Sequence, residues 1–148
     1  MTAAIKAVQD WLKSCPLVAQ QLGENVSFYI DYLPDRTAQF SIEDSPGAPV
    51  LKSYFDKTLR AKNYVLASRM VYSEDIAQQA ANSAFWDAFA DWIERQSAAR
   101  RFPELGPGRR AKAVEVTTSG YILASEDAAC RFQIQIQLQY FQLKGAAQ

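Results

Sequence analysis

Hydrophobic and polar residues alternate strictly near the end of the chain, between Arg131 and Gln142. A period of two residues is typical of an extended chain with one dry face, so this segment is predicted to be a β-strand. At ~3.3 Å per residue it extends ~40 Å, about the width of a compact domain of this length. The strand is expected to cross the whole fold or run past it.

The polar positions of this strand are all uncharged amides. They are Gln133, Gln135, Gln137 and Gln139, and the apolar positions between and beside them are Phe132, Ile134, Ile136, Leu138 and Tyr140. A face without charge can meet another protein surface at low desolvation cost, and natural monomers tend to avoid such surfaces. Two interpretations stay open: a surface strand whose amides bind water, or a subunit contact.

Two segments show the helical period. Ile5, Val8, Leu12 and Cys15 are spaced for an amphipathic helix over 3–15, which Pro16 should end. A longer helical region is predicted at about 74–99, started by Ser73-Glu74-Asp75. Asn82-Ser83 could cap a second helix and so divide it. Its apolar stripe is Phe85, Ala88, Phe89, Trp92 and Ile93, and its polar side is Asp87, Asp91, Glu94 and Arg95.

Trp86 falls about 100° from Phe85 on a helical turn. It therefore either borders the core or contacts a partner, and we include it among the candidate subunit-contact residues.

The remaining segments favour strands. Val26–Leu33 and Ala38–Glu43 flank a turn at Pro34-Asp35-Arg36 and suggest a hairpin. A run with apolar residues on both faces, from Leu59 to Tyr72, suggests a central strand.

Val50–Phe55 could be a short strand or a bend. Ala113–Ala124, interrupted at Ser119-Gly120, should form a hairpin with the 131–142 strand. The predicted fold class is α+β, a mostly antiparallel sheet with both helical segments packed on it.

Length and charge restrict the number of domains and the classes of partner that the protein could have. The chain has 148 residues, 49% of them hydrophobic, and 16 basic residues balance 16 acidic ones. We expect one domain over residues 1–148 and no overall field that attracts nucleic acid or an anionic membrane. No run of eighteen apolar residues occurs, so a soluble, unexported protein is expected.

The two cysteines, Cys15 and Cys130, have neither disulfide-framework nor metal spacing. They suit a reducing cytosol, and each is expected to be a buried thiol. For Cys130 the alternative is a thiol activated by the neighbouring Arg131.

The sequence contains little evidence of a catalytic site. The chain has no histidine, which removes the usual general base and zinc ligand. Asp87 and Asp91, one helical turn apart, could form a carboxylate pair, but a solvated helix face is the ordinary interpretation. Leu105-Gly106-Pro107-Gly108 lacks the lysine and hydroxyl of a phosphate loop. We therefore expect no enzyme activity, no cofactor and no metal.

The only concentration of charge is the segment Arg100–Lys112, in which five of thirteen residues are basic and one is acidic. Its basic residues are Arg100, Arg101, Arg109, Arg110 and Lys112. As a glycine- and proline-rich loop it could contact phosphates, stay solvated, or form ion pairs between subunits.

The order of these segments resembles the small minor structural proteins of tailed phages and prophages. The resemblance is carried by Tyr29–Pro34, Val65–Arg69, Phe85–Glu94, Glu115–Tyr121, Gln133-Ile134-Gln135 and Tyr140-Phe141-Gln142. It covers residues 5 to 142, and its motifs are structural rather than catalytic.

This resemblance implies a tail terminator or neck protein: an α+β subunit of a hexameric ring that sits on the tail tube and joins it to the head. It implies tail-tube and head-connector partners, brief contact with passing DNA, and residence in the host cytoplasm and then the virion neck. The glutamine strand would contact other subunits, and the basic segment would face the lumen or an adjoining ring. Alternatives are a head-completion protein, a small enzyme such as an acyltransferase, or a nucleic-acid-binding regulator.

Overall fold

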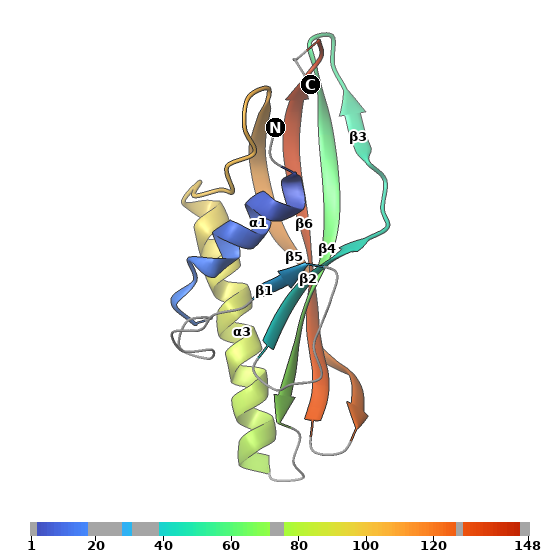
Figure 1. Cartoon of the computed structure of the whole chain (residues 1–148). Coiled ribbons are helices and arrows are strands. Elements are labelled where there is room, and N and C mark those ends of the chain that lie inside the picture. Colours follow the sequence, from blue (N-terminus) through green and yellow to red (C-terminus); the bar gives the residue numbers. More distant parts are fainter. Residues whose placement is uncertain (1–2, 18–27, 31–38, 72–75, 127–128, 146–148) are drawn as a thin grey trace.

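The protein is an α+β structure in which two helices cover one face of a six-stranded sheet (Figure 1). The computed structural model describes residues 3–17, 28–30, 39–71, 76–126 and 129–145. The helices are α1 (Ala4–Lys13) and α3 (Ile76–Ala98). The strands are β1 (Phe28–Ile30), β2 (Gln39–Ser45), β3 (Val50–Ser53), β4 (Lys57–Val71), β5 (Arg109–Glu126) and β6 (Ala129–Leu143). The predicted fold class is confirmed.

Both helices form where the helical period predicted them. In α1, Val8 and Leu12 are fully buried, and Cys15 just beyond the helix is buried as expected. In α3 the helix runs without a break through Asn82 and Ser83, so the suggested division there is wrong. The proposed cap at 73–75 lies outside the described residues.

The sheet has the strand order β1-β2-β4-β6-β5, and β3 pairs with β4 beside β2. All pairs are antiparallel except β1 with β2, which run parallel with Phe28 opposite Phe40. The predicted hairpin of these two segments is therefore wrong. Its turn, residues 34–36, lies outside the described residues, and the sequence pattern gave the strands but not their direction.

The two longest pairings place β4 and β6 in the middle of the sheet. Fifteen register pairs join β4 to β6, from Lys57–Leu143 to Val71–Ala129. The glutamine strand is consequently an interior strand and not a sheet edge. The expected central position of the 59–72 segment is confirmed, since β4 has partners on both sides.

β5 is the long edge strand, and its pairing with β6 shifts register at four places. One shift lies between Thr118 and Tyr121, so Ser119-Gly120 makes an irregularity inside one strand rather than the predicted interruption. At that position the Gln135 backbone N–H donates to Thr118 Oγ1 at 3.0 Å. Irregular edges of this kind hinder pairing with a further strand.

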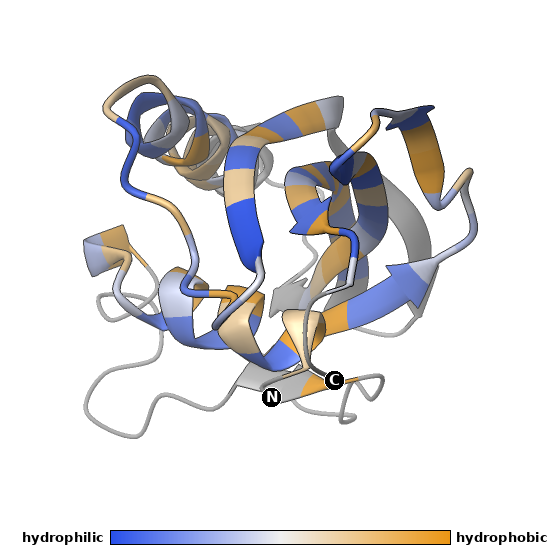
Figure 2. Cartoon of the chain, turned by 90° about the horizontal axis from the view of Figure 1, so that it is seen from above, coloured by the Kyte–Doolittle hydropathy of each residue, from blue (hydrophilic) through white to orange (hydrophobic). Residues whose placement is uncertain are grey.

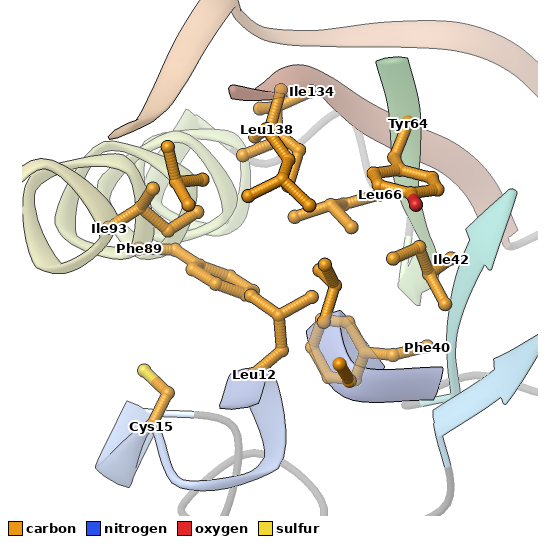
Figure 3. Packing of buried hydrophobic residues seen from close by; sticks show 14 of the residues in the cluster. Leu12, Cys15, Phe40, Ile42, Tyr64, Leu66, Phe89, Ile93, Ile134 and Leu138 are labelled. Atoms are coloured by element: carbon orange, nitrogen blue, oxygen red, sulfur yellow. The ribbon is translucent and has the colours of Figure 1, made fainter. Parts of the chain in front are cut away.

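The hydrophobic core lies between the helices and the sheet (Figure 3). β6 contributes Ile134, Ile136 and Leu138, and α3 contributes Phe89 and Ile93, all fully buried. The contact of Trp11 with Trp92, at 5.2 Å between ring centroids, joins α1 to α3. One apolar cluster therefore includes both helices and the sheet.

Trp86 belongs to this core. Its side chain is 1% exposed and stacks on Phe89 and Phe132, at centroid distances of 5.8 and 5.6 Å. The assignment of Trp86 to a subunit interface is therefore corrected. The helical stripe is rotated from the predicted one because the wide indole fills the space between α3 and the sheet.

Candidate functional site

β6 presents two chemically different faces. Its even-numbered residues from Phe132 to Tyr140 are buried toward the helices. Its glutamines point to the side that neither α1 nor α3 covers, which we call the helix-free side. Figure 2 shows the strand alternation as bands of hydrophilic and hydrophobic colour. The glutamines lie opposite Ala67, Val65, Asn63 and Ala61 of β4. We call the four glutamines with these β4 neighbours the glutamine face.

The amides of this face bond to one another. Gln139 Nε2 donates to Gln137 Oε1 at 2.8 Å, and Gln137 Nε2 donates to Asn63 Oδ1 at 3.3 Å. Gly47 packs over Asn63, since a Cβ placed on Gly47 would lie 2.0 Å from Asn63 Nδ2. The row is thus an ordered ladder of side chains.

One end of the glutamine face is covered by a salt bridge. Arg131 Nη2 lies 2.7 Å from Glu43 Oε2, and Arg131 Nε donates to Gln133 Oε1 at 3.0 Å. The bridge connects β6 to β2 across β4, and Ala67 on β4 is fully buried. Gln133 is itself only 5% exposed. Only Gln135, Gln137 and Gln139 therefore remain half-exposed, and Gln133 is not a surface contact residue.

At its other end the glutamine face continues into a group of cations and aromatic rings. Lys57 Nζ lies 4.7 Å from the Phe141 ring centre and 5.6 Å from that of Tyr54. Arg110 Cζ lies 5.9 Å from Phe141, and Lys52 Nζ lies 5.1 Å from Tyr54. We call these five residues the basic aromatic cluster. Cations over aromatic faces are attracted by the ring quadrupole, which orders the cluster.

Two open pockets adjoin the cluster and share Arg110 and Phe141. The first, of about 260 Å³, is lined by Asp56, Lys57, Gly108, Arg109, Arg110, Phe141 and Leu143. The second, of about 530 Å³, is lined by Arg100, Phe102, Arg110, Ala111, Lys112 and Phe141. Cations outnumber carboxylates in both, so the end of the sheet is locally basic.

The predicted basic loop, Arg100–Lys112, is only partly a loop, because its C-terminal end belongs to a strand. Arg109, Arg110 and Lys112 begin β5 rather than belonging to a loop. The preceding residues are anchored, because Trp11 Nε1 donates to the Arg101 carbonyl at 2.9 Å and Leu105 is buried. The Arg109 guanidinium donates to the Leu105 carbonyl. This segment is a packed connection to α1, and Arg101 lies outside both pockets.

Arg100 has an unusual backbone. Its φ is 59°, and the N–H groups of Arg100 and Arg101 donate to the carbonyls of Ser97 and Gln96. This is the Schellman end of a helix, in which the left-handed position usually holds glycine. An arginine there is strained, and its exposed side chain lines the second pocket.

Gly106 and Gly108 have a structural role. Both have positive φ, 89° and 78°, and Arg109 N–H donates to the Gly106 carbonyl at 3.3 Å. Positive φ favours glycine. The glycines form the turn that leads into β5.

Exposed apolar side chains surround the tip formed by β3 and β4. Phe55 is 100% exposed, and Val50, Leu51 and Leu143 are also exposed. Figure 1 shows this end of the sheet rising beyond the helices, and Figure 2 looks down on it. Large exposed apolar groups beside polar ones are typical of protein contact surfaces.

Asp87 and Asp91 are exposed on α3, as a solvated helix face requires. Within the described residues, no group of three or more histidine, cysteine or acidic side chains is arranged to hold a metal ion. The side chain of Cys130 lies outside the described side chains, so its burial and its reactivity stay predictions.

Lys52, Tyr54, Lys57 and Phe141 were not identified from the sequence. The first three flank the tip between β3 and β4, whose structure the sequence left undecided, and Phe141 comes from a strand about 85 residues further along. Only the β4–β6 register brings them together. A usable sequence signal would have been the two lysines, Lys52 and Lys57, on either side of the adjacent aromatic residues Tyr54 and Phe55.

None of the helices in the described part of the chain is long and apolar enough to cross a membrane. No protein-family model matches the sequence, and no curated protein matches it. A solved structure whose name states no function matches 97% of this chain and 92% of its own, with 12% identity and a TM-score of 0.44. That score is too low to show a shared fold.

Proposed function

We propose that the protein is a non-enzymatic assembly subunit of a tailed phage or prophage, a tail terminator that caps the tail tube as a ring and joins it to the head. The observation that carries this proposal is the continuous helix-free surface from the glutamine face to the exposed apolar tip. Another protein subunit could contact this surface along much of the length of the sheet.

The physical basis is the low cost of covering this surface. Amides that already bond to each other lose little when water is removed, whereas a charged face would lose much of its solvation. The apolar tip supplies hydrophobic area, and the cations supply a polar rim, which is the usual composition of interfaces. Gln135, Gln137 and Gln139 would contact other subunits.

The basic residues Arg100, Arg109, Arg110 and Lys112 would face the lumen or an adjoining ring. The expected partners are further copies of the chain, the tail-tube protein and head-connector proteins, with transient contact to passing DNA. The protein would act in the host cytoplasm during assembly and then remain at the virion neck. No cofactor is required for this role.

A tube-length assay tests the proposal. Purified protein is added to growing tail tubes, and tube lengths are measured by electron microscopy. Capped tubes should keep a fixed length, whereas tubes with a heat-inactivated sample should continue to grow. Continued growth with the native protein would exclude termination, and binding to heads but not to tubes would favour a head-completion protein.

A further inference from the structure

We propose that the basic aromatic cluster binds an acidic stripe on α3 of a second copy of the chain. The stripe consists of Asp87, Asp91 and Glu94. The contact rests on the proposed ring function and names the charged surfaces that would hold neighbouring subunits together.

The cations of the cluster are free to take an external anion. Neither of the ion pairs seen among the described residues, Lys6–Asp10 and Arg131–Glu43, uses a cation of the cluster. Lys57 and Arg110 are instead arranged around Phe141, and Lys112 is exposed beside them. Several unpaired cations held in a fixed geometry form a local positive field.

The acidic stripe is accessible and lies along one face of α3, so it can contact the basic aromatic cluster of another copy. Asp87, Asp91 and Glu94 are all exposed, and their spacing of four and three residues places them along one helix face. Exposed Ala84 and Ala98 continue the same line. Small neighbours allow another surface to approach the helix closely, so the carboxylates can reach cations of a facing subunit.

Within one copy, no ion pair among the described residues joins the stripe to the cluster. The stripe lies on α3, whereas the cluster lies at the end of β4 and β6 that projects beyond α3 (Figure 1). Contact between two different surfaces is heterologous, and repeated heterologous contacts close into a ring when the rotation permits. The formal net charge of zero adds no overall repulsion between copies.

A protein surface fits the cluster better than nucleic acid does. Exposed Val50, Leu51, Phe55 and Leu143 adjoin the cations. A phosphate backbone would leave this apolar area in water, but a helix with alanines beside its carboxylates can cover part of it.

Charge reversal in two matched variants tests the contact. The first carries Arg110→Glu and Lys112→Glu, and the second carries Asp87→Lys and Asp91→Lys. All four side chains are exposed, so folding should be retained, which circular dichroism checks. Arg109 stays unchanged because it holds the Leu105 carbonyl. The control is Arg101→Glu, an exposed arginine outside both pockets.

Self-association is measured by sedimentation at low salt and high protein concentration. Each variant alone should associate at least about tenfold more weakly than wild type, and an equimolar mixture of the two should recover association through reversed pairs. The Arg101→Glu control should match wild type. Arg100→Gly should also weaken association while fitting its left-handed backbone position.

Three results would overturn the contact: a wild type that stays monomeric, variants that associate normally, or a mixture that does not recover. Loss of salt-sensitive DNA binding in the first variant, with unchanged self-association, would identify nucleic acid as the occupant instead. The tube-length assay separates the two proposals, because variants that still fix tube length disprove this contact and leave termination standing.

Discussion

Trp86 shows how a single residue can determine how a helix packs on a sheet. Its indole is stacked between Phe89 of the same helix and Phe132 of β6, with 9° between the ring planes in both pairs. Phe40 of β2 meets it edge-on at 6.2 Å. Stacked and edge-on aromatic contacts add to the energy of burial. Trp86 therefore joins α3 to both the middle and the side of the sheet.

Replacing this indole should be costly. We expect Trp86→Ala to reduce the free energy of unfolding by ~3–5 kcal/mol, since it removes a large buried ring and leaves a cavity. Trp86→Phe keeps an aromatic ring, so it should reduce the free energy of unfolding by clearly less than Trp86→Ala. Urea denaturation followed by circular dichroism measures both. A loss below about 1 kcal/mol for Trp86→Ala would contradict the core position.

At the scale of elements, the glutamine face depends on a close approach between the chain before β3 and the middle of β4. Gly47 lies against the Asn63 amide, and that amide in turn accepts from Gln137 of β6. Glycine allows this approach because it has no Cβ. The hydrogen-bonded ladder therefore extends from β6 to Asn63 of β4, and Gly47 packs against its end.

Gly47→Ala should disturb this ladder. The new methyl group would displace the Asn63 amide and cost ~1 kcal/mol of unfolding free energy, the usual value of one hydrogen bond. In an Asn63→Ala background the clash is absent, so the same change should be neutral or slightly stabilising. A double-mutant cycle by chemical denaturation measures the difference. Equal effects in both backgrounds would show that Gly47 and Asn63 do not interact.

At the scale of the whole molecule, the two faces of the sheet differ in composition, and under the proposed function one would serve folding and the other recognition. The helix side of β6 carries the core, and the other side carries uncharged amides that end at the basic aromatic cluster. Substitutions on the glutamine side should therefore change assembly much more than stability.

The double variant Gln135→Lys and Gln137→Lys tests this separation. Both side chains are half-exposed on the helix-free face, so the core stays intact and the thermal midpoint should fall by only a few degrees, about what ~1 kcal/mol represents. Ring formation or tube capping should be impaired, because two ammonium groups would be desolvated in the contact. Calorimetry and the tube-length assay supply the readouts. If the double variant caps tail tubes normally, the glutamine side of β6 has no role in assembly and the strand serves only the fold.

The local structure of most segments follows from the sequence alone. Alternation predicted β6, a run of apolar residues on both faces predicted most of β4, and the helical period predicted α1 and α3. Side-chain periodicity carries this information because it follows directly from backbone geometry. The sequence also predicted the α+β class, the C-terminal hairpin of β5 and β6, and the burial of Cys15. Five basic residues near 100–112 marked part of the candidate site.

The arrangement of these helices and strands relative to one another follows from the folded chain and not from any one segment. The parallel direction of β1 and β2, the interior place of Trp86 and the covering of Gln133 by Arg131 all depend on contacts between distant segments. The meeting of Lys57 with Phe141 depends on the register of two long strands. Periodicity along one segment carries no information about which other segment will face it, so the site could be assembled only from the folded chain.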